Sequence, residues 1–138
     1  MSRLFQHRNH GTRSEFDELK KVLGRLNAAS LQTRLAVGAG VHLANAEFIR
    51  RFGGFESFRR TPSEQQQQFG AVLSELELGS RSQEPGVAVG IGLYRIWLAD
   101  MLADRRDTAE LLGEELTRLS RRAGGGCPAR DDPWMADS

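Results

Sequence analysis

Apolar residues in the segment 14–28 recur at steps of three and four, which places them on one face of a helix. They are Phe16, Leu19, Leu23 and Leu26. Ser14 suits the N-cap of this helix, and the first turn after it contains Glu15, Asp17 and Glu18, whose negative charge the positive end of the helix dipole favours. We therefore expect a helix over 14–28.

The segment 30–52 carries two patterns at once. Apolar and small residues alternate between Leu35 and Leu43, and this period of two is typical of a strand. Small and apolar residues also form a row with a spacing of four: Ala36, Gly40, Ala44 and Phe48. Because the segment is long for a strand and 43–51 is rich in helix formers, we favour a helix with a small-residue face for close packing. The alternative is a strand followed by a helix.

A third helix is expected after a loop that starts at Gly53-Gly54 and continues to Arg60. Thr61 can cap this helix, Pro62 suits its first position, and Glu64 stands where a capping box needs an acidic residue. Its apolar face is formed by Phe69, Val72, Leu73 and Leu76. Gly79 is expected to end the helix, and 80–85 to form a loop.

The segment 86–103 again alternates, with Val87, Val89, Ile91 and Leu93, before a helical cluster around Trp97. A last helix is expected from Asp107 or Thr108 to about Arg122, where arginines favour the C-terminal turns. Its apolar side consists of four leucines: Leu111, Leu112, Leu116 and Leu119.

An internal similarity relates the two small-residue segments. The sequence AVGAGV starting at Ala36 resembles AVGIGL, which starts 52 residues later at Ala88. We predict an all-α protein, a compact bundle of four or five helices. It could consist of two duplicated helix-pair halves plus a C-terminal helix, and chance similarity is the open alternative. Residues 1–13 are expected to form a flexible arm, 14–123 one domain and 124–138 a flexible tail.

Composition narrows the classes of protein. At 138 residues the chain suits one domain, and its net charge of +1 gives no reason to expect nucleic acid or an anionic membrane. The single Cys127 cannot form an intrachain disulfide, which fits a reducing compartment. Arg95 and Asp100 interrupt the longest apolar run, so no membrane span is expected. With no signal peptide at its start, we predict a cytoplasmic protein.

Candidate chemical groups do not converge on a catalytic centre. His7 and His10 fall in the predicted arm, and His42 is expected to be a buried or boundary histidine with a hydrogen-bonded partner. The glycines near 38–40 and 90–92 lack the complete dinucleotide or P-loop motif, so we assign them to helix packing. Carboxylates between Asp100 and Glu115 are interpreted as an exposed charged face. We expect no enzyme, no cofactor and no metal site.

The segment 50–60 is the most distinctive, because two arginine pairs bracket three phenylalanines around a Gly-Gly break. Arginine forks beside aromatic faces would suit single-stranded nucleic acid or a phosphorylated partner. Alternatively, the phenylalanines anchor the loop in the core while the arginines stay solvated. The candidate partner-binding residues are Arg50, Arg51, Phe55, Phe58, Arg59 and Arg60, together with Trp134, which could dock from the tail.

The sequence therefore predicts a small non-enzymatic protein-interaction module, such as a regulatory, adaptor or assembly subunit. An accessory nucleic-acid-binding protein that uses 50–60 is the alternative. Because small-residue faces and the phenylalanines provide more apolar surface than a short chain easily buries, we also expect self-association as a homodimer.

Overall fold

The computed structural model describes residues 13–123, and every regular element in this range is an α-helix. The six helices are α2 (Arg13–Ala28), α3 (Leu31–Phe52), α4 (Phe55–Arg59), α5 (Ser63–Arg81), α6 (Pro85–Leu102) and α7 (Arg106–Ala123). The all-α prediction is confirmed. The helices of the described range number six rather than four or five, because the segment expected as a loop contains the short helix α4.

Some of the expectations fall on parts of the chain that the structure does not describe. Residues 1–12 of the predicted arm and the whole predicted tail, 124–138, lie outside the described residues. The same holds for His7, His10, Cys127 and Trp134.

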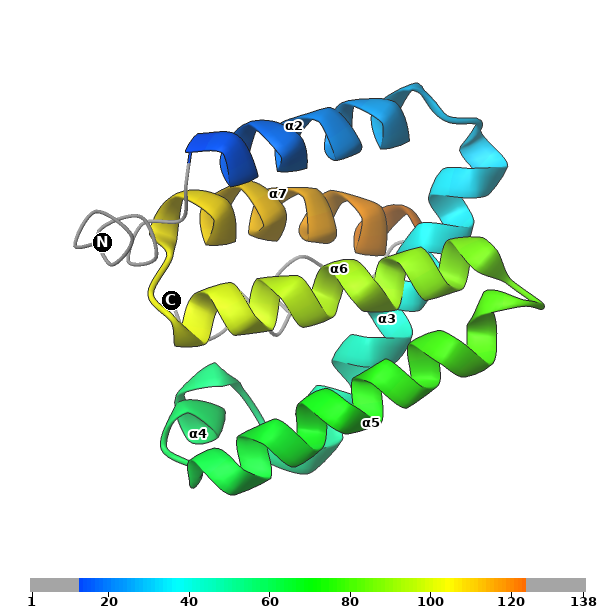
Figure 1. The fold of residues 1–138 in the computed structure, drawn as a ribbon. Helices are drawn as coiled ribbons and strands as arrows, with labels where there is room; N and C mark the ends of the chain where they lie inside the picture. Colours follow the sequence, from blue (N-terminus) through cyan, green and yellow to red (C-terminus); the bar gives the residue numbers. More distant parts are fainter. Residues whose placement is uncertain (1–12, 124–138) are drawn as a thin grey trace.

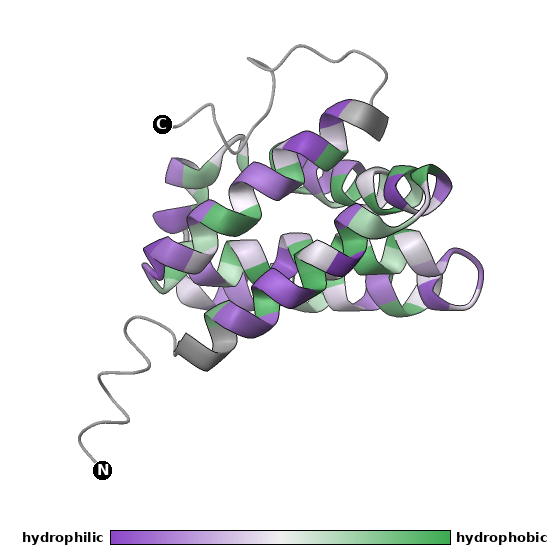
Figure 2. Cartoon of the chain, turned by 90° about the horizontal axis from the view of Figure 1, so that it is seen from above, coloured by the Kyte–Doolittle hydropathy of each residue, from purple (hydrophilic) through white to green (hydrophobic). Residues whose placement is uncertain are grey.

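Helix α6 lies at the centre of the packing. It contacts α3, α5 and α7, while α2 lies against α7 and α3 (Figure 1). Seen from above, α2 and α7 carry hydrophobic and hydrophilic residues in alternation along their length, as amphipathic helices do (Figure 2). Their apolar residues, including Leu23, Leu112 and Leu116, are buried in the core.

The two small-residue segments form the contact between α3 and α6. A Cβ atom on Gly40 would lie 2.1 Å from the carbonyl oxygen of Val87, and one on Gly90 would lie 2.0 Å from the carbonyl oxygen of Val37. The two backbones therefore touch at positions where no other side chain fits. Both segments are helical, so the prediction of close helix packing is confirmed and the strand alternative for 30–52 is wrong.

Aromatic rings fill the core beside this contact. The rings of Phe48 and Phe58 are 5.2 Å apart in an edge-on arrangement, and those of Tyr94 and Trp97 are 5.4 Å apart. The buried hydroxyl of Tyr94 donates to Oδ1 of Asn45 at 2.8 Å, which satisfies both polar groups inside the core. Burial raises the pKa of the Tyr94 phenol well above its ordinary value.

The bounds of α3 agree with the expected segment 30–52, and its start has a cap that was not predicted. The hydroxyl of Ser30 caps α3 by accepting from the Thr33 amide at 3.1 Å. Gly53 ends the helix with a φ of 83°, a left-handed conformation that glycine adopts without steric cost.

The two ends of α5 differ from the expectation. Pro62 has an extended ψ of 144° and occupies the cap position itself, so α5 begins at Ser63 and the prediction of Thr61 as its cap is wrong. The Thr61 hydroxyl instead donates to the carbonyl of Ser57 at 2.9 Å, next to the end of α4. Gly79 does not end α5 either, because it keeps a negative φ and the helix continues to Arg81.

Candidate functional site

The phenylalanines of 50–60 point into the protein. Phe58 and Phe55 are buried, with 1% and 7% of their surface exposed, and Phe52 is partly buried against the same core. The Phe52 and Phe58 rings are 4.7 Å apart, and the Phe55 ring is 6.4 Å from that of Trp97. This geometry agrees with the alternative in which the phenylalanines anchor the segment.

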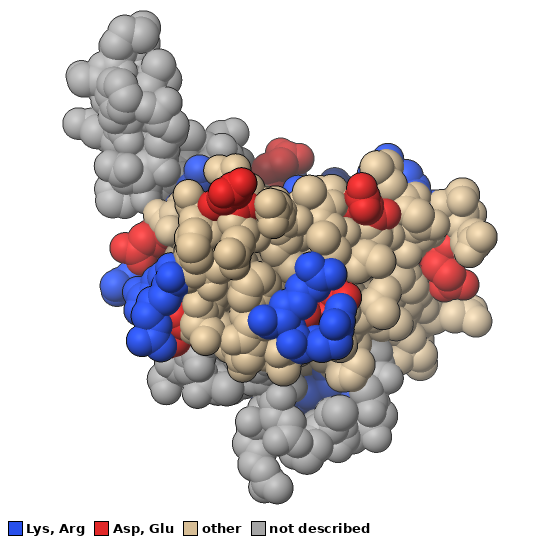
Figure 3. Space-filling view, turned by 90° about the horizontal axis from the view of Figure 1, so that it is seen from below, with Lys and Arg blue, Asp and Glu red and all other residues tan. Residues whose placement is uncertain are grey.

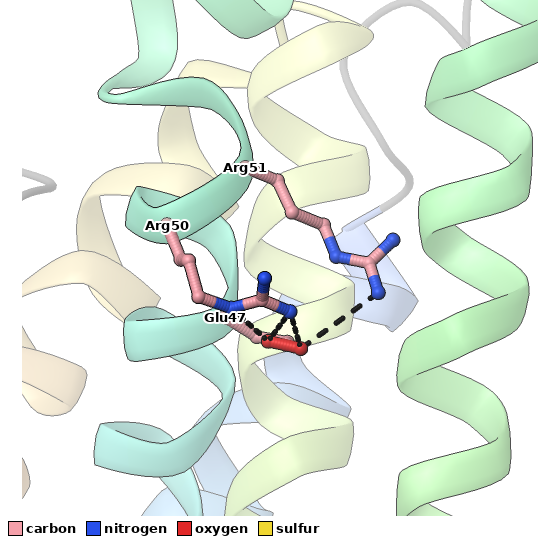
Figure 4. A network of polar contacts seen from close by, with 3 residues as sticks. All are labelled: Glu47, Arg50 and Arg51. Carbon is pink, nitrogen blue, oxygen red and sulfur yellow. Dashed lines mark hydrogen bonds and ion pairs between the residues drawn. The ribbon is translucent and has the colours of Figure 1, made fainter.

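The first arginine pair lies at the end of α3. Arg50 and Arg51 both reach the carboxylate of Glu47, with nitrogen–oxygen distances of 2.5 and 3.7 Å (Figure 4). The hydrogen bond from Arg50 lowers the pKa of Glu47 below its ordinary value. The Arg51 guanidinium also lies 5.8 Å from the centre of the Phe69 ring, a cation–π distance.

The second arginine pair lies at the end of α4. Arg59 forms an ion pair with Glu56, and Nε of Arg60 donates to the main-chain oxygen of Glu56 at 3.3 Å. Figure 3 shows basic side chains of one face in small separate groups with acidic side chains beside them. Within residues 13–123, Arg50, Arg51 and Arg59 are each paired with an acidic side chain, Glu47 or Glu56, which offsets their positive charge toward a nucleic-acid backbone.

A groove of about 1060 Å³ opens between α4, the end of α6 and the first turns of α7. Its apolar lining comes from all three helices and consists of Phe55, Trp97, Met101, Ala109 and Gly113. Phe55 and Arg59 belong both to this groove and to the predicted partner-binding set, whereas Arg50, Arg51, Phe58 and Arg60 do not line it. The structure thus divides the candidate residues between two places.

Charged side chains of both signs surround this apolar lining. Five are acidic, namely Glu56, Asp100, Asp104, Glu110 and Glu114, and three are basic, namely Arg59, Arg105 and Arg106. The charged lining therefore has an excess of two negative charges at neutral pH. Asp100 is 5% exposed and lies 3.5 Å from an Arg105 nitrogen, so the prediction of a wholly exposed acidic face is wrong for this carboxylate. It is also wrong for Glu115, which is 5% exposed and paired with Arg118.

The turn that joins α6 to α7 shapes one edge of the groove. The Arg105 amide donates to the carbonyl of Asp100 at 2.9 Å, and the Asp104 amide donates to that of Met101 at 3.2 Å. These two bonds form a Schellman motif, in which glycine usually takes the left-handed position. Here Asp104 occupies it with a φ of 59°, the one positive φ of a non-glycine residue within 13–123.

The structure also bears on three other candidates, which are His42, a metal site and a membrane-spanning helix. Nδ1 of His42 lies 3.2 Å from Oγ of Ser120, which confirms the expected hydrogen-bonded partner, although His42 itself is exposed. Within residues 13–123, no group of three or more His, Cys, Asp or Glu side chains is placed to hold a metal ion. None of the helices in this range has both the length and the apolar character needed to cross a membrane.

The groove was not predicted from the sequence. From the sequence, Trp97 and Met101 were interpreted as ordinary core positions, and Asp104 to Arg106 as part of a charged surface. The one local feature of this site is Asp104, a non-glycine residue just after the end of α6. In the sequence alone, such a residue looks the same as a residue inside a longer helix.

Comparison of the chain with protein-family models, curated proteins and solved structures finds no match in any of the three.

Proposed function

We propose that this chain is a non-enzymatic protein-interaction module, such as a regulatory, adaptor or assembly subunit, and that it binds its partner in the groove between α4, α6 and α7. The observation that carries the proposal is the combination of an aromatic and aliphatic lining with charged side chains around it. Protein-binding surfaces commonly combine an apolar centre with a polar rim in this way.

The charges of the groove indicate the chemistry of the partner. Because acidic side chains outnumber basic ones, a segment with an arginine or lysine beside an apolar side chain would be attracted and oriented. Its apolar side chain would contact the partly exposed Met101, beside the edge of the buried Trp97, and its cation would lie near the exposed Glu110 and Glu114. Such a segment is short enough to be supplied by a loop or by one helix of another protein.

Nucleic-acid binding through 50–60 is the second candidate. Its support is the exposure of Arg50, Arg51 and Arg59, whose side chains are 66%, 40% and 58% exposed. Glu47 and Glu56 pair with these arginines, and the buried phenylalanines are not placed to stack on bases. The protein-interaction proposal therefore has more support.

A peptide-display selection tests the proposed function. We expect the wild-type chain to enrich peptides that combine basic and apolar residues. The double variant Glu110→Lys/Glu114→Lys should bind those peptides at least about tenfold more weakly, since it reverses two charges beside the apolar lining. Glu75→Lys is the matched control, because Glu75 is exposed on α5 and does not line the groove.

Two results would contradict the proposal. One is a selection without enrichment, and the other is equal peptide binding by the groove variant and the wild type. Fluorescence anisotropy with single-stranded RNA and DNA over a salt series tests the second candidate. Steep loss of affinity with salt, removed by Arg59→Glu/Arg60→Glu, would favour nucleic acid instead.

A further inference from the structure

The groove between α4, α6 and α7 has two carboxylates that no cation of residues 13–123 neutralises. Its other three acidic side chains each have an arginine partner in this range: Glu56 with Arg59, Asp100 with Arg105 and Asp104 with Arg106. Glu110 and Glu114 have no such partner among the described residues, and both are exposed, one turn apart on α7. Because both stand beside the apolar lining, the groove combines an apolar surface with an unbalanced negative charge.

Residues 1–12, which precede α2, have a complementary composition. They contain Arg3, Arg8, two histidines and no acidic residue, and the apolar pair Leu4-Phe5 stands between the two arginines. A cation beside an apolar side chain is the combination that suits the groove. The segment 124–138, by contrast, contains three aspartates and a single arginine, so its net charge has the same sign as that of the groove.

The position of α2 allows residues 1–12 to reach the groove. Helices α2 and α7 lie side by side and begin at the same end of the bundle (Figures 1 and 2), and the groove opens at the first turns of α7. A path from Arg13 around the start of α7 covers about two helix diameters, or roughly 20–24 Å. Phe5 is eight residues before Arg13, and a fully extended chain of that length spans about 26–29 Å. Phe5 can therefore reach the apolar lining.

We propose that residues 1–12 occupy the groove of their own chain, with Phe5 against Met101 and Arg8 beside Glu110 and Glu114. The inference rests on the proposed function, because it makes residues 1–12 a competitor of the segment that a partner supplies. A partner then binds only by displacing them, which regulates access to the groove.

The covalent link makes even a weak contact effective. A short linker gives the attached segment an effective concentration of about 1 mM, well above that of a second copy at micromolar protein concentration. If the free segment had a dissociation constant of about 0.1 mM, it would fill the groove in roughly nine of ten molecules. Removing the contact should therefore raise the apparent affinity for a competing peptide about tenfold.

Disulfide trapping in the full chain tests the docking without a partner. In a Cys127→Ser background, Leu4→Cys with Met101→Cys should form an intrachain disulfide under mild oxidation, identified by peptide mapping of the monomer. Leu4→Cys with Leu43→Cys is the matched control, because Leu43 is exposed on α3 and does not line the groove. This pair should link several times less.

Three results of the trapping experiment would overturn the inference. The first is equal linking of the two pairs, and the second is linking mainly between chains, which would indicate the segment of a second copy. The third is more efficient linking of Trp134→Cys with Met101→Cys, which would indicate that 124–138 occupies the groove instead.

Peptide binding tests the competition. In fluorescence anisotropy, Arg8→Glu should bind the selected basic and apolar peptides about tenfold more tightly than the wild type, because its reversed charge is repelled by Glu110 and Glu114. Arg8→Lys is the matched control, since it keeps the charge and should bind as the wild type does. Equal affinities of Arg8→Glu and the wild type would overturn the competition while leaving the proposed function intact. If no peptide is enriched at all, the proposed function fails, and the disulfide pattern alone decides whether residues 1–12 occupy the groove.

Discussion

Replacing Gly90 by alanine tests whether the contact between α3 and α6 determines the fold. The added Cβ atom would lie 2.0 Å from the Val37 carbonyl oxygen and 2.8 Å from the Val41 amide nitrogen. Both are main-chain atoms of a helix, so neither can rotate away as a side chain would. The two helices must separate, and the core residues packed beside them lose contact.

The expected loss of stability follows from two opposing contributions. Overpacking of a core costs about 1–3 kcal/mol and occasionally more, and a clash between two backbones belongs at the upper end of that range. Alanine gains up to about 1 kcal/mol over glycine in helix propensity. We therefore expect Gly90→Ala to lower the free energy of unfolding by about 2–3 kcal/mol, which is a large share of the stability of a typical small domain.

Urea unfolding followed by far-UV circular dichroism measures this change, and two glycines of α5 serve as controls. A Cβ atom on Gly70 or Gly79 would have no neighbour within 4 Å, and neither glycine has a positive φ. Alanine at either position should stabilise the protein by about 0.5–1 kcal/mol. The reasoning fails if Gly90→Ala is as stable as the wild type, or if the control substitutions destabilise the protein equally.

Four further predictions concern single side chains. Asp104→Gly should raise the free energy of unfolding by about 0.5–1 kcal/mol in urea titrations, because it removes a left-handed side chain, and Asp104→Ala should not. Phe55→Ala should lower it by about 3–5 kcal/mol in the same assay if the ring is a core anchor. In NMR titrations, Arg50→Gln should raise the pKa of Glu47. The ion pair of Glu47 stabilises the fold at pH values above the ordinary carboxyl pKa, and this stabilisation is lost as the pH falls through the lowered pKa of Glu47. Burial raises the pKa of Tyr94 in the folded state only, so the free energy of unfolding should fall as the pH rises above the ordinary tyrosine pKa. Tyr94 is the single tyrosine of the chain, and ultraviolet absorbance should therefore detect its ionisation only when the protein unfolds.

The long helices could be predicted from the sequence because their signals are local. Gly53 and the apolar spacing of 14–28 act within one or two helical turns, and the structure uses both of them as expected. Helix α4 was not predicted, because its five residues are too few to show the helical spacing of apolar positions. The expected end at Gly79 was wrong because a glycine permits a helix to end there but does not require it.

The groove could not be predicted because it depends on packing between distant parts of the chain. It joins Phe55 of α4 to Trp97 of α6 and Gly113 of α7, and no sequence pattern relates these positions. The pairing of Asp100 with Arg105 is local by contrast, since the two residues are five apart, but it depends on the turn at Asp104 between α6 and α7, which the sequence did not predict. The arginines of 50–60 were recognised from composition alone, but their pairing with Glu47 and Glu56 follows from helix spacing of three and four residues.

The resemblance between the segments that begin at Ala36 and Ala88 has a physical explanation in the structure. A Cβ atom on Gly90 would lie 3.0 Å from the Cα atom of Gly40, so the two similar segments meet each other at the crossing of α3 and α6. Both helices need small residues at that point, and the same requirement produces similar sequences. The neighbouring helices are not arranged equivalently, because α5 packs extensively along α6 whereas α2 contacts α3 only slightly. This difference favours a shared packing requirement over duplication as the source of the similarity, and exchange of the two segments would then disrupt the fold despite their resemblance.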